Sequence, residues 1–303
     1  MMIMKNYTQQ HGLTLIELMV ALVISLLILA GLFTVYQSNQ RGYRLNDGLV
    51  RVQESGRFAI DFLSRDVRQA AYPASDPNAN SIVPPEFHFF LFTGGANDVD
   101  IAGTNAGDYP PSDILSLRHG FSTLASPDCN GNTPANGGNT DPIGIPMTQG
   151  ATTWVPDGTT TWNRYDIRNT GRQNNRGNPI FALYCNGIEL VEGIENMQVL
   201  YGVDTSQPQD FVVDQYFTYN NVPDVIGNLV TDWGRIISIR IALLASSVDE
   251  KANAPSSRSF NLLGNNLIFD GTGVDSNGNA IAADQKIRRV YTTTVLIRNN
   301  INS

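Results

Sequence analysis

An unbroken apolar run near the amino terminus constrains this chain more than any other feature. Residues 13–36 read LTLIELMVALVISLLILAGLFTVY, with Glu17 as the only charged residue and no proline. As a helix this segment would be about 36 Å long, which is enough to cross the ~30 Å hydrocarbon core of a bilayer. The run therefore predicts a membrane-spanning helix over residues 13–36.

The residues ahead of the run bear on how the chain reaches a membrane. Residues 1–12, MMIMKNYTQQHG, are mostly polar and carry Lys5 as their only charge at neutral pH. A secretory signal peptide would have a shorter apolar region, of about 7–15 residues, followed by an A-x-A-like cleavage site. The sequence has neither feature, so we expect the apolar segment to stay in the mature protein. On composition alone, a plain signal anchor is the alternative.

A more specific pattern occupies residues 11–20, HGLTLIELMV. It resembles the class III signal of type IV prepilins, in which a glycine and an apolar residue precede a TLIELMV-like stretch. The resemblance implies that a prepilin peptidase cuts after Gly12, which removes residues 1–12 as a leader, and that the new amino terminus at Leu13 is methylated. Leu13 departs from the phenylalanine that is usual at this position.

Glu17 would become the fifth residue of the mature chain, where this family carries a characteristic acid. A carboxylate near the centre of a bilayer costs about 2–3 kcal/mol or more, so it is rarely left without a partner. In a filament, the free amine of a neighbouring subunit is the expected partner, and the pair would set the axial register between subunits. Because tip subunits of these systems commonly lack the acid, Glu17 predicts a subunit that lies beneath another one. A solvated acid near the membrane surface is the alternative.

The helical pattern continues to Pro73 and predicts an amphipathic helix over residues 37–72. At 100° per residue, the apolar residues fall on one stripe and the charged residues on the opposite side. The stripe comprises Leu45, Leu49, Val52, Ala59, Leu63, Val67 and Ala70, and the charged face comprises Arg44, Asp47, Arg51, Glu54, Arg57, Asp61, Arg65 and Arg68. Phe58 projects among the charges and is a candidate intersubunit contact; a solvated face is the alternative. Glycines such as Gly56 are expected to weaken the helix by up to ~1 kcal/mol each.

From Pro73 onward the composition shifts to Gly, Pro, Asn, Asp and Thr, which predicts a β-rich head over residues 73–303. Strand-like segments lie at 113–119, 181–185, 188–191, 235–243 and 291–297, and Asn186-Gly187 is typical of a hairpin turn. Long low-complexity loops are expected at 121–179 and 252–285. A long helix followed by such strands predicts an α+β, pilin-like fold with an antiparallel sheet packed on the helix stripe.

Three blocks of the head extend the resemblance to one branch of the pilins. Residues 189–204, 233–247 and 286–300 are similar to minor pilins of the PilW type, whereas the resemblance does not extend to residues 73–180. The two cysteines, Cys129 and Cys185, both follow the apolar run. Because exported domains fold in an oxidising compartment, we expect a disulfide between them; two distant thiols are too few ligands for a metal site.

The sequence offers no signature of catalysis or of a cofactor. His11, His88 and His119 lack metal-ligand spacing, and no G-x-S-x-G, P-loop or H-E-x-x-H pattern occurs. The acidic segment 270–284 misses the spacing of an EF-hand, which leaves calcium as a minor alternative to a surface loop. A net charge of −8 argues against nucleic acid as a partner. We therefore expect neither an enzyme nor a cofactor-binding protein.

These features predict a minor pilin that primes type IV pilus assembly near the filament tip, in support of adhesion, twitching motility or DNA uptake. The resemblance implies other minor pilins, the major pilin, the prepilin peptidase and the inner-membrane assembly platform as partners. The chain is expected to cross the inner membrane once, with its head in the periplasm, before it enters the pilus. A tip adhesin and a minor pseudopilin of type II secretion are the alternatives.

Overall fold

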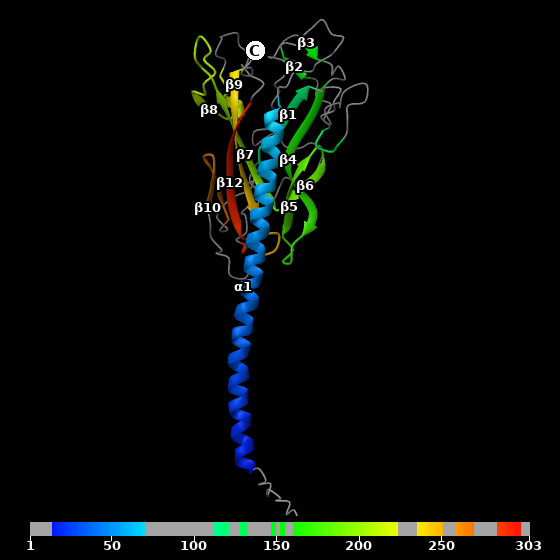
Figure 1. The fold of residues 1–303 in the computed structure, drawn as a ribbon. Helices are drawn as coiled ribbons and strands as arrows, with labels where there is room; N and C mark the ends of the chain where they lie inside the picture. The colour runs from blue at the N-terminus through cyan, green and yellow to red at the C-terminus, as the bar shows by residue number, and fades with distance from the viewer. Residues whose placement is uncertain are drawn as a thin grey trace, which may run out of the picture. The chain divides into compact units, whose positions relative to one another are not determined.

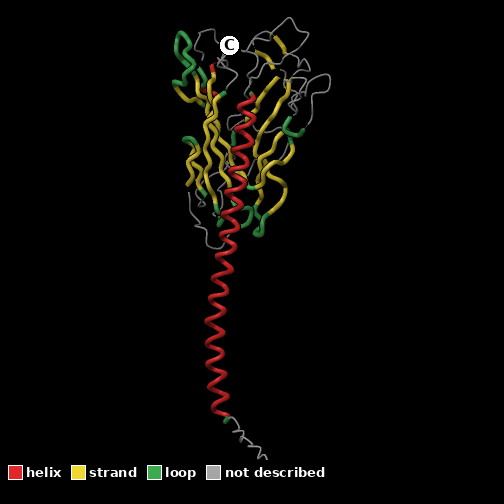
Figure 2. Tube along the Cα trace, viewed as in Figure 1, coloured by secondary structure: helices red, strands yellow, loops and turns green. Residues whose placement is uncertain are grey.

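A single helix, α1 (Leu15–Gln69), is formed by the apolar run and most of the amphipathic segment. In this computed structural model (Figures 1 and 2) the described residues are 14–70, 112–120, 128–131, 147–149, 152–154, 160–223, 235–250, 259–269 and 284–297. The chain divides into two units, residues 1–47 and residues 48–303. The carboxy-terminal part of α1 therefore belongs to the same unit as the head.

A capping box starts the helix. The Oε2 atom of Glu17 accepts hydrogen bonds from the backbone N–H and the hydroxyl of Thr14, at 3.0 and 2.9 Å. The backbone N–H of Glu17 donates in return to the Thr14 hydroxyl, at 3.4 Å. A threonine three residues before a glutamate satisfies backbone N–H groups that a helix start leaves unpaired. This local role of Glu17 was not predicted.

The first antiparallel sheet has the strand order β1-β4-β5-β6. Its strands are β1 (Leu115–Gly120), β4 (Thr160–Gln173), β5 (Pro179–Cys185) and β6 (Ile188–Glu192). Asn186 and Gly187 join β5 to β6 with φ angles of 47° and 82°. Two positive φ angles in a two-residue hairpin loop favour Asn-Gly, so the predicted turn is confirmed.

The second antiparallel sheet has the order β12-β9-β7-β8. Its strands are β7 (Ile194–Val203), β8 (Gln215–Phe217), β9 (Ile236–Ser246) and β12 (Arg288–Leu296). Gly193 connects the sheets with a φ of 83°, and a Cβ at this position would lie 2.7 Å from the carbonyl oxygen of Ser246. Only glycine fits both the positive φ and this close approach.

Three smaller elements complete the described part of the chain. The hairpin of β2 (Met147–Gln149) and β3 (Thr152–Trp154) precedes β4 in the chain, and the 3₁₀ turn η3 (Tyr219–Asn221) follows β8. The hairpin β10 (Ser259–Leu262) and β11 (Asn265–Ile268) packs against β9 through a cluster of Ala242, Leu244, Leu262, Leu267 and Phe269. This hairpin therefore buries Ala242 and Leu244 on one face of β9.

The two predicted loop regions contain strands, so that part of the prediction is wrong. The first region, 121–179, contains the hairpin β2–β3 and the strand β4. The second, 252–285, contains the hairpin β10–β11. The buried side chains of β4 include Asn163 and Asp166, so the apolar alternation that marks a strand is missing from its sequence. Asn163 is hydrogen-bonded by residues of other segments, Asp66 and Cys129, whereas Asp166 pairs with Arg168 of the same strand.

The predicted stripe is buried at Val52, Ala59, Leu63 and Val67 of α1 and at Ala70, directly after the helix. Leu49 remains 38% exposed. Gly56 is also buried, against the ring of Tyr291 in β12; a Cβ on Gly56 would lie 2.2 Å from Cε2 of that ring. This glycine therefore permits close packing of the helix on the second sheet, which the sequence prediction treated only as a weak point of the helix.

Candidate functional site

The proposed processing site lies next to a helix whose surface suits a membrane. Gly12 and Leu13 fall outside the described residues, so cleavage and methylation there stay predictions. From Leu15 to Tyr36 the apolar side chains are exposed, and α1 is long and apolar enough to cross a bilayer. The hydroxyls of Ser25 and Thr34 donate to backbone oxygens of the same helix, both at 2.7 Å. Satisfying such groups internally is what a hydrocarbon environment demands.

The charged face of α1 points to solvent, as the periodicity predicts. Asp61 and Arg65 form an ion pair of 2.7 Å with both side chains mostly exposed. An exposed pair of this kind contributes at most about 1 kcal/mol. Phe58 is 55% exposed among these charges, with its ring centroid 6.2 Å from that of Phe62. An exposed aromatic ring beside a second ring is the kind of side chain that protein interfaces bury.

A buried carboxylate, Asp66, fixes α1 to the first sheet. The Nδ2 atom of Asn163 donates to both Asp66 oxygens, at 3.0 and 2.9 Å, and the Tyr165 hydroxyl donates at 2.8 Å. Burial and then the negative charges of Asp66 and Asp128 raise the pKa of Tyr165 well above its ordinary value. The sequence analysis left Asp66 out of both faces; its position three residues after Leu63 was the signal that it lies inward.

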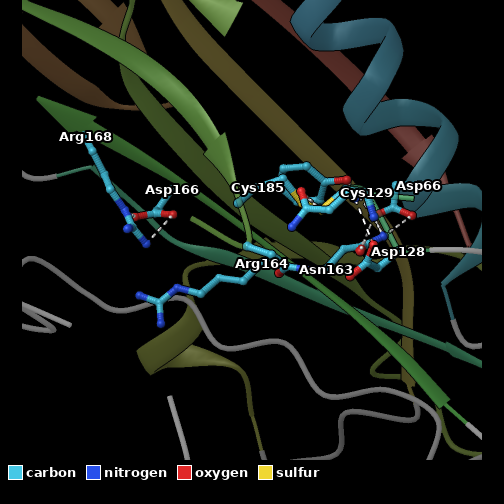
Figure 3. The surroundings of a disulfide bond; sticks show 11 residues. Asp66, Asp128, Cys129, Asn163, Arg164, Asp166, Arg168 and Cys185 are labelled. Carbon is cyan, nitrogen blue, oxygen red and sulfur yellow. Dashed lines mark hydrogen bonds and ion pairs between the residues drawn. A yellow bond between two sulfur atoms is a disulfide. The ribbon is translucent and has the colours of Figure 1, made fainter. Parts of the chain in front are cut away.

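A disulfide lies beside this carboxylate (Figure 3). Cys129 and Cys185 are bonded, with Cα atoms 6.3 Å apart, which joins the turn at 128–131 to the end of β5. The backbone N–H of Cys129 donates to Oδ1 of Asn163 at 2.9 Å. Asn163 therefore links the disulfide-held turn to Asp66 on the helix.

A groove opens between α1 and this turn. It has a volume of about 350 Å³ and is lined by Phe58, Asp61, Phe62, Arg65, Asp66, Asp128 and Tyr165, among others. We call it the Phe58 groove. Sequence reasoning singled out Phe58 and the cysteines separately, but the pairing of helix and turn that forms the groove depends on the tertiary fold.

A second buried polar cluster joins β7 to β12. Glu195 accepts from Nζ of Lys286 at 3.0 Å and from Nε of Arg288 at 2.5 Å, and Arg288 also pairs with Asp284. Burial alone would raise the pKa of Glu195, but the positive charges and hydrogen bonds of Arg288 and Lys286 lower it to about 2. The guanidinium of Arg288 lies 3.8 Å from the ring centroid of Phe269. The charges of this cluster gave no sequence signal of burial.

The described ranges offer little for metal chemistry. No group of three or more His, Cys, Asp or Glu side chains within them is arranged to hold a metal ion. Residues 270–283 of the candidate calcium loop, together with His11 and His88, lie outside these ranges, and Asp284 pairs with Arg288. The arrangement of the described polar groups is that of structural hydrogen-bond clusters.

The helix and the antiparallel sheets define the class of protein: an α+β, pilin-like fold, as predicted. Two family models match the chain. Residues 173–299 match the model described as Type IV Pilus-assembly protein W, and residues 7–33 match the prokaryotic N-terminal methylation motif. These matches support a minor pilin of the type IV pilus system. Comparisons with curated proteins and with solved structures found no match.

Proposed function

We propose that this chain is a minor pilin that primes type IV pilus assembly together with other minor pilins near the filament tip. The observation that carries the proposal is the presence on one chain of the methylation motif and of the pilus-assembly match. The exposed apolar surface of residues 15–36 supports it, because a soluble protein would have to bury such a surface. Domains of this family are structural rather than catalytic.

The proposal includes a course of maturation. The prepilin peptidase cuts after Gly12 and Leu13 is methylated; residues 13–36 then hold the chain in the inner membrane, with the head in the periplasm. The assembly platform moves the subunit into the pilus, where it contacts the major pilin and other minor pilins. These steps require the apolar segment to remain in the mature protein. Its length supports this, because it is longer than the apolar region of a cleaved signal peptide.

Glu17 has two roles in this proposal. In the isolated subunit its carboxylate belongs to the capping box with Thr14. In the filament it pairs with the amino terminus of a neighbouring subunit, which places this chain beneath another one. The two roles are separable, because the capping box needs Thr14 and the charge pair does not.

The experiment compares Glu17→Ala with Thr14→Ala in full-length protein, in cells that lack the native copy. We expect both variants to insert into the membrane and to be cleaved, and only Glu17→Ala to lose surface pili. Equal loss of pili in the two variants would reduce Glu17 to a helix cap. Normal pili in cells that lack the chain altogether, with impaired protein secretion, would instead favour a pseudopilin of type II secretion.

The adhesin alternative needs a finer test than removal of residues 121–179, because that range contains β4. Deletion of residues 132–146 spares both four-stranded sheets and the disulfide. Lost attachment of cells with normal pili would favour an adhesin. We expect no such separation.

A further inference from the structure

We propose that the Phe58 groove receives an arginine or lysine side chain of a neighbouring pilin. The inference rests on the proposed function, because it requires the chain to be a filament subunit. It adds the place of the contact on the head and the chemistry of the partner.

The aromatic walls of the groove suit a cation that still carries hydrocarbon. Phe58 and Phe62 lie with ring centroids 6.2 Å apart at an angle of 42°, and Phe62 meets Tyr165 edge to face at 6.1 Å. A guanidinium or ammonium within about 6 Å of a ring centroid is attracted to the ring face. The methylene stem of the same side chain would cover the exposed part of Phe58.

The charge of the groove favours a cation over an anion or a neutral group. Among the described residues that line it are three carboxylates, Asp61, Asp66 and Asp128, and one guanidinium, that of Arg65. Asp66 and Asp128 are only 7% and 5% exposed, so solvent and salt screen their charge poorly. Both already have hydrogen-bond partners inside the head. They therefore act on an incoming cation through their electric field and need not release their donors.

Asp61 supplies the direct contact at the rim. Its pairing with Arg65 is exposed on both sides, so exchanging Arg65 for an incoming cation costs little. Once a partner covers the groove, the new pair is shielded from water and its attraction grows. Rim charges of this kind decide which partner binds and how fast.

The occupant we propose is another pilin because the required chemistry lies on the same helix of this chain. Arg51, Arg57 and Arg68 are exposed on the charged face of α1. A subunit built on the same plan presents such side chains where helices of adjacent subunits meet. The groove lies on that helix, at Phe58 to Arg65, and not on the far side of a sheet.

The test uses full-length protein in cells that lack the native copy, with a photoreactive benzoylphenylalanine in place of Phe58. We expect a cross-link to another pilin, in a peptide that contains arginine or lysine. Asp61→Lys and Phe58→Ala should lower the number of pili by about tenfold, the scale of one lost interface contact. Glu54→Lys and Val50→Ala, exposed positions outside the groove lining, are the matched controls and should change little.

Charge reversal gives the sharper readout. Replacing the cross-linked basic residue by glutamate should abolish the cross-link, and combining it with Asp61→Lys should restore it. The inference would be overturned if Phe58 gave no cross-link to a pilin, or if the cross-linked peptide contained no basic residue. It would also be overturned if Glu54→Lys lowered the number of pili as much as Asp61→Lys. If Glu17→Ala removes pili while the groove variants leave them normal, the groove inference fails and the proposed function stands. If cells without the chain make normal pili, the proposed function itself fails.

Discussion

Tyr165 on β4 donates a 2.8 Å hydrogen bond to Asp66 on α1, although the two residues are 99 positions apart in the chain. This hydrogen bond and those from Asn163 offset the free-energy cost of burying the Asp66 carboxylate, and they hold α1 against β4. A buried charge is tolerated only where donors meet it. The relationship fixes the helix to the first sheet at the level of the Phe58 groove.

Tyr165→Phe tests the hydrogen bond to Asp66. The variant removes one hydrogen bond to a charged group and leaves Asn163 in place, so we expect a loss of about 1.5–3 kcal/mol in the free energy of unfolding. Urea denaturation of the full-length protein in detergent measures it. The control is Tyr43→Phe, at a position that is 76% exposed, which should change stability by less than ~0.5 kcal/mol. Equal stability of the two variants would contradict the role of the hydroxyl.

Gly56→Ala has two opposing effects on stability, one on helix propensity and one on packing against the second sheet. Alanine in place of glycine stabilises a helix by up to ~1 kcal/mol, but the added Cβ would meet the Tyr291 ring at 2.2 Å. Overpacking of this kind costs about 1–3 kcal/mol, so we expect net destabilisation. Gly42→Ala has nothing within 4 Å of the new Cβ and should stabilise the protein. The same sign of change in both variants, measured by urea denaturation, would refute the close packing.

The Glu195 cluster makes stability depend on pH. The pKa of Glu195 falls from 4.5 to about 2 on folding. A lowered carboxyl pKa contributes stability above pH ~4.5, and this contribution disappears as the pH falls toward 2. We expect the free energy of unfolding to fall by on the order of 3 kcal/mol over that window. Urea denaturation midpoints at successive pH values measure this change. Glu195→Gln should be less stable at pH 7 and should lack this pH-dependent part, whereas exposed Glu54→Gln should keep it.

Reduction of the disulfide should weaken the head. Cys129 and Cys185 are separated by 56 positions, and opening a loop of that size costs about 4 kcal/mol in the chain-entropy model. We expect the Cys129→Ala, Cys185→Ala double variant to lose this amount in urea denaturation. Mass spectrometry after alkylation checks the bond directly: the native protein should take up label only after reduction. Labelling without a reductant would show that the thiols are free.

Local sequence patterns predicted much of the fold. The apolar run and the 3.6-residue periodicity account for α1 up to Gln69, because each helical turn is made from neighbouring residues. Asn186-Gly187 and the alternation in β9 and β12 identified the hairpin and two strands of the second sheet for the same reason. The candidate site was predicted only in separate parts, as Glu17, Phe58 and the two cysteines.

Tertiary structure decided the rest, because the burial of a polar side chain depends on partners from distant segments. The polar side chain of Asn163 can be buried in β4 only because Asp66 and the backbone N–H of Cys129 form hydrogen bonds with it. Glu195 is buried only because Lys286, just before β12, and Arg288, at the start of β12, meet it. The sequence by itself determined a long helix with an acid near its start and an aromatic ring among the charges of its second half. The groove at Phe58 exists only because the disulfide and Asn163 bring a remote turn against that helix.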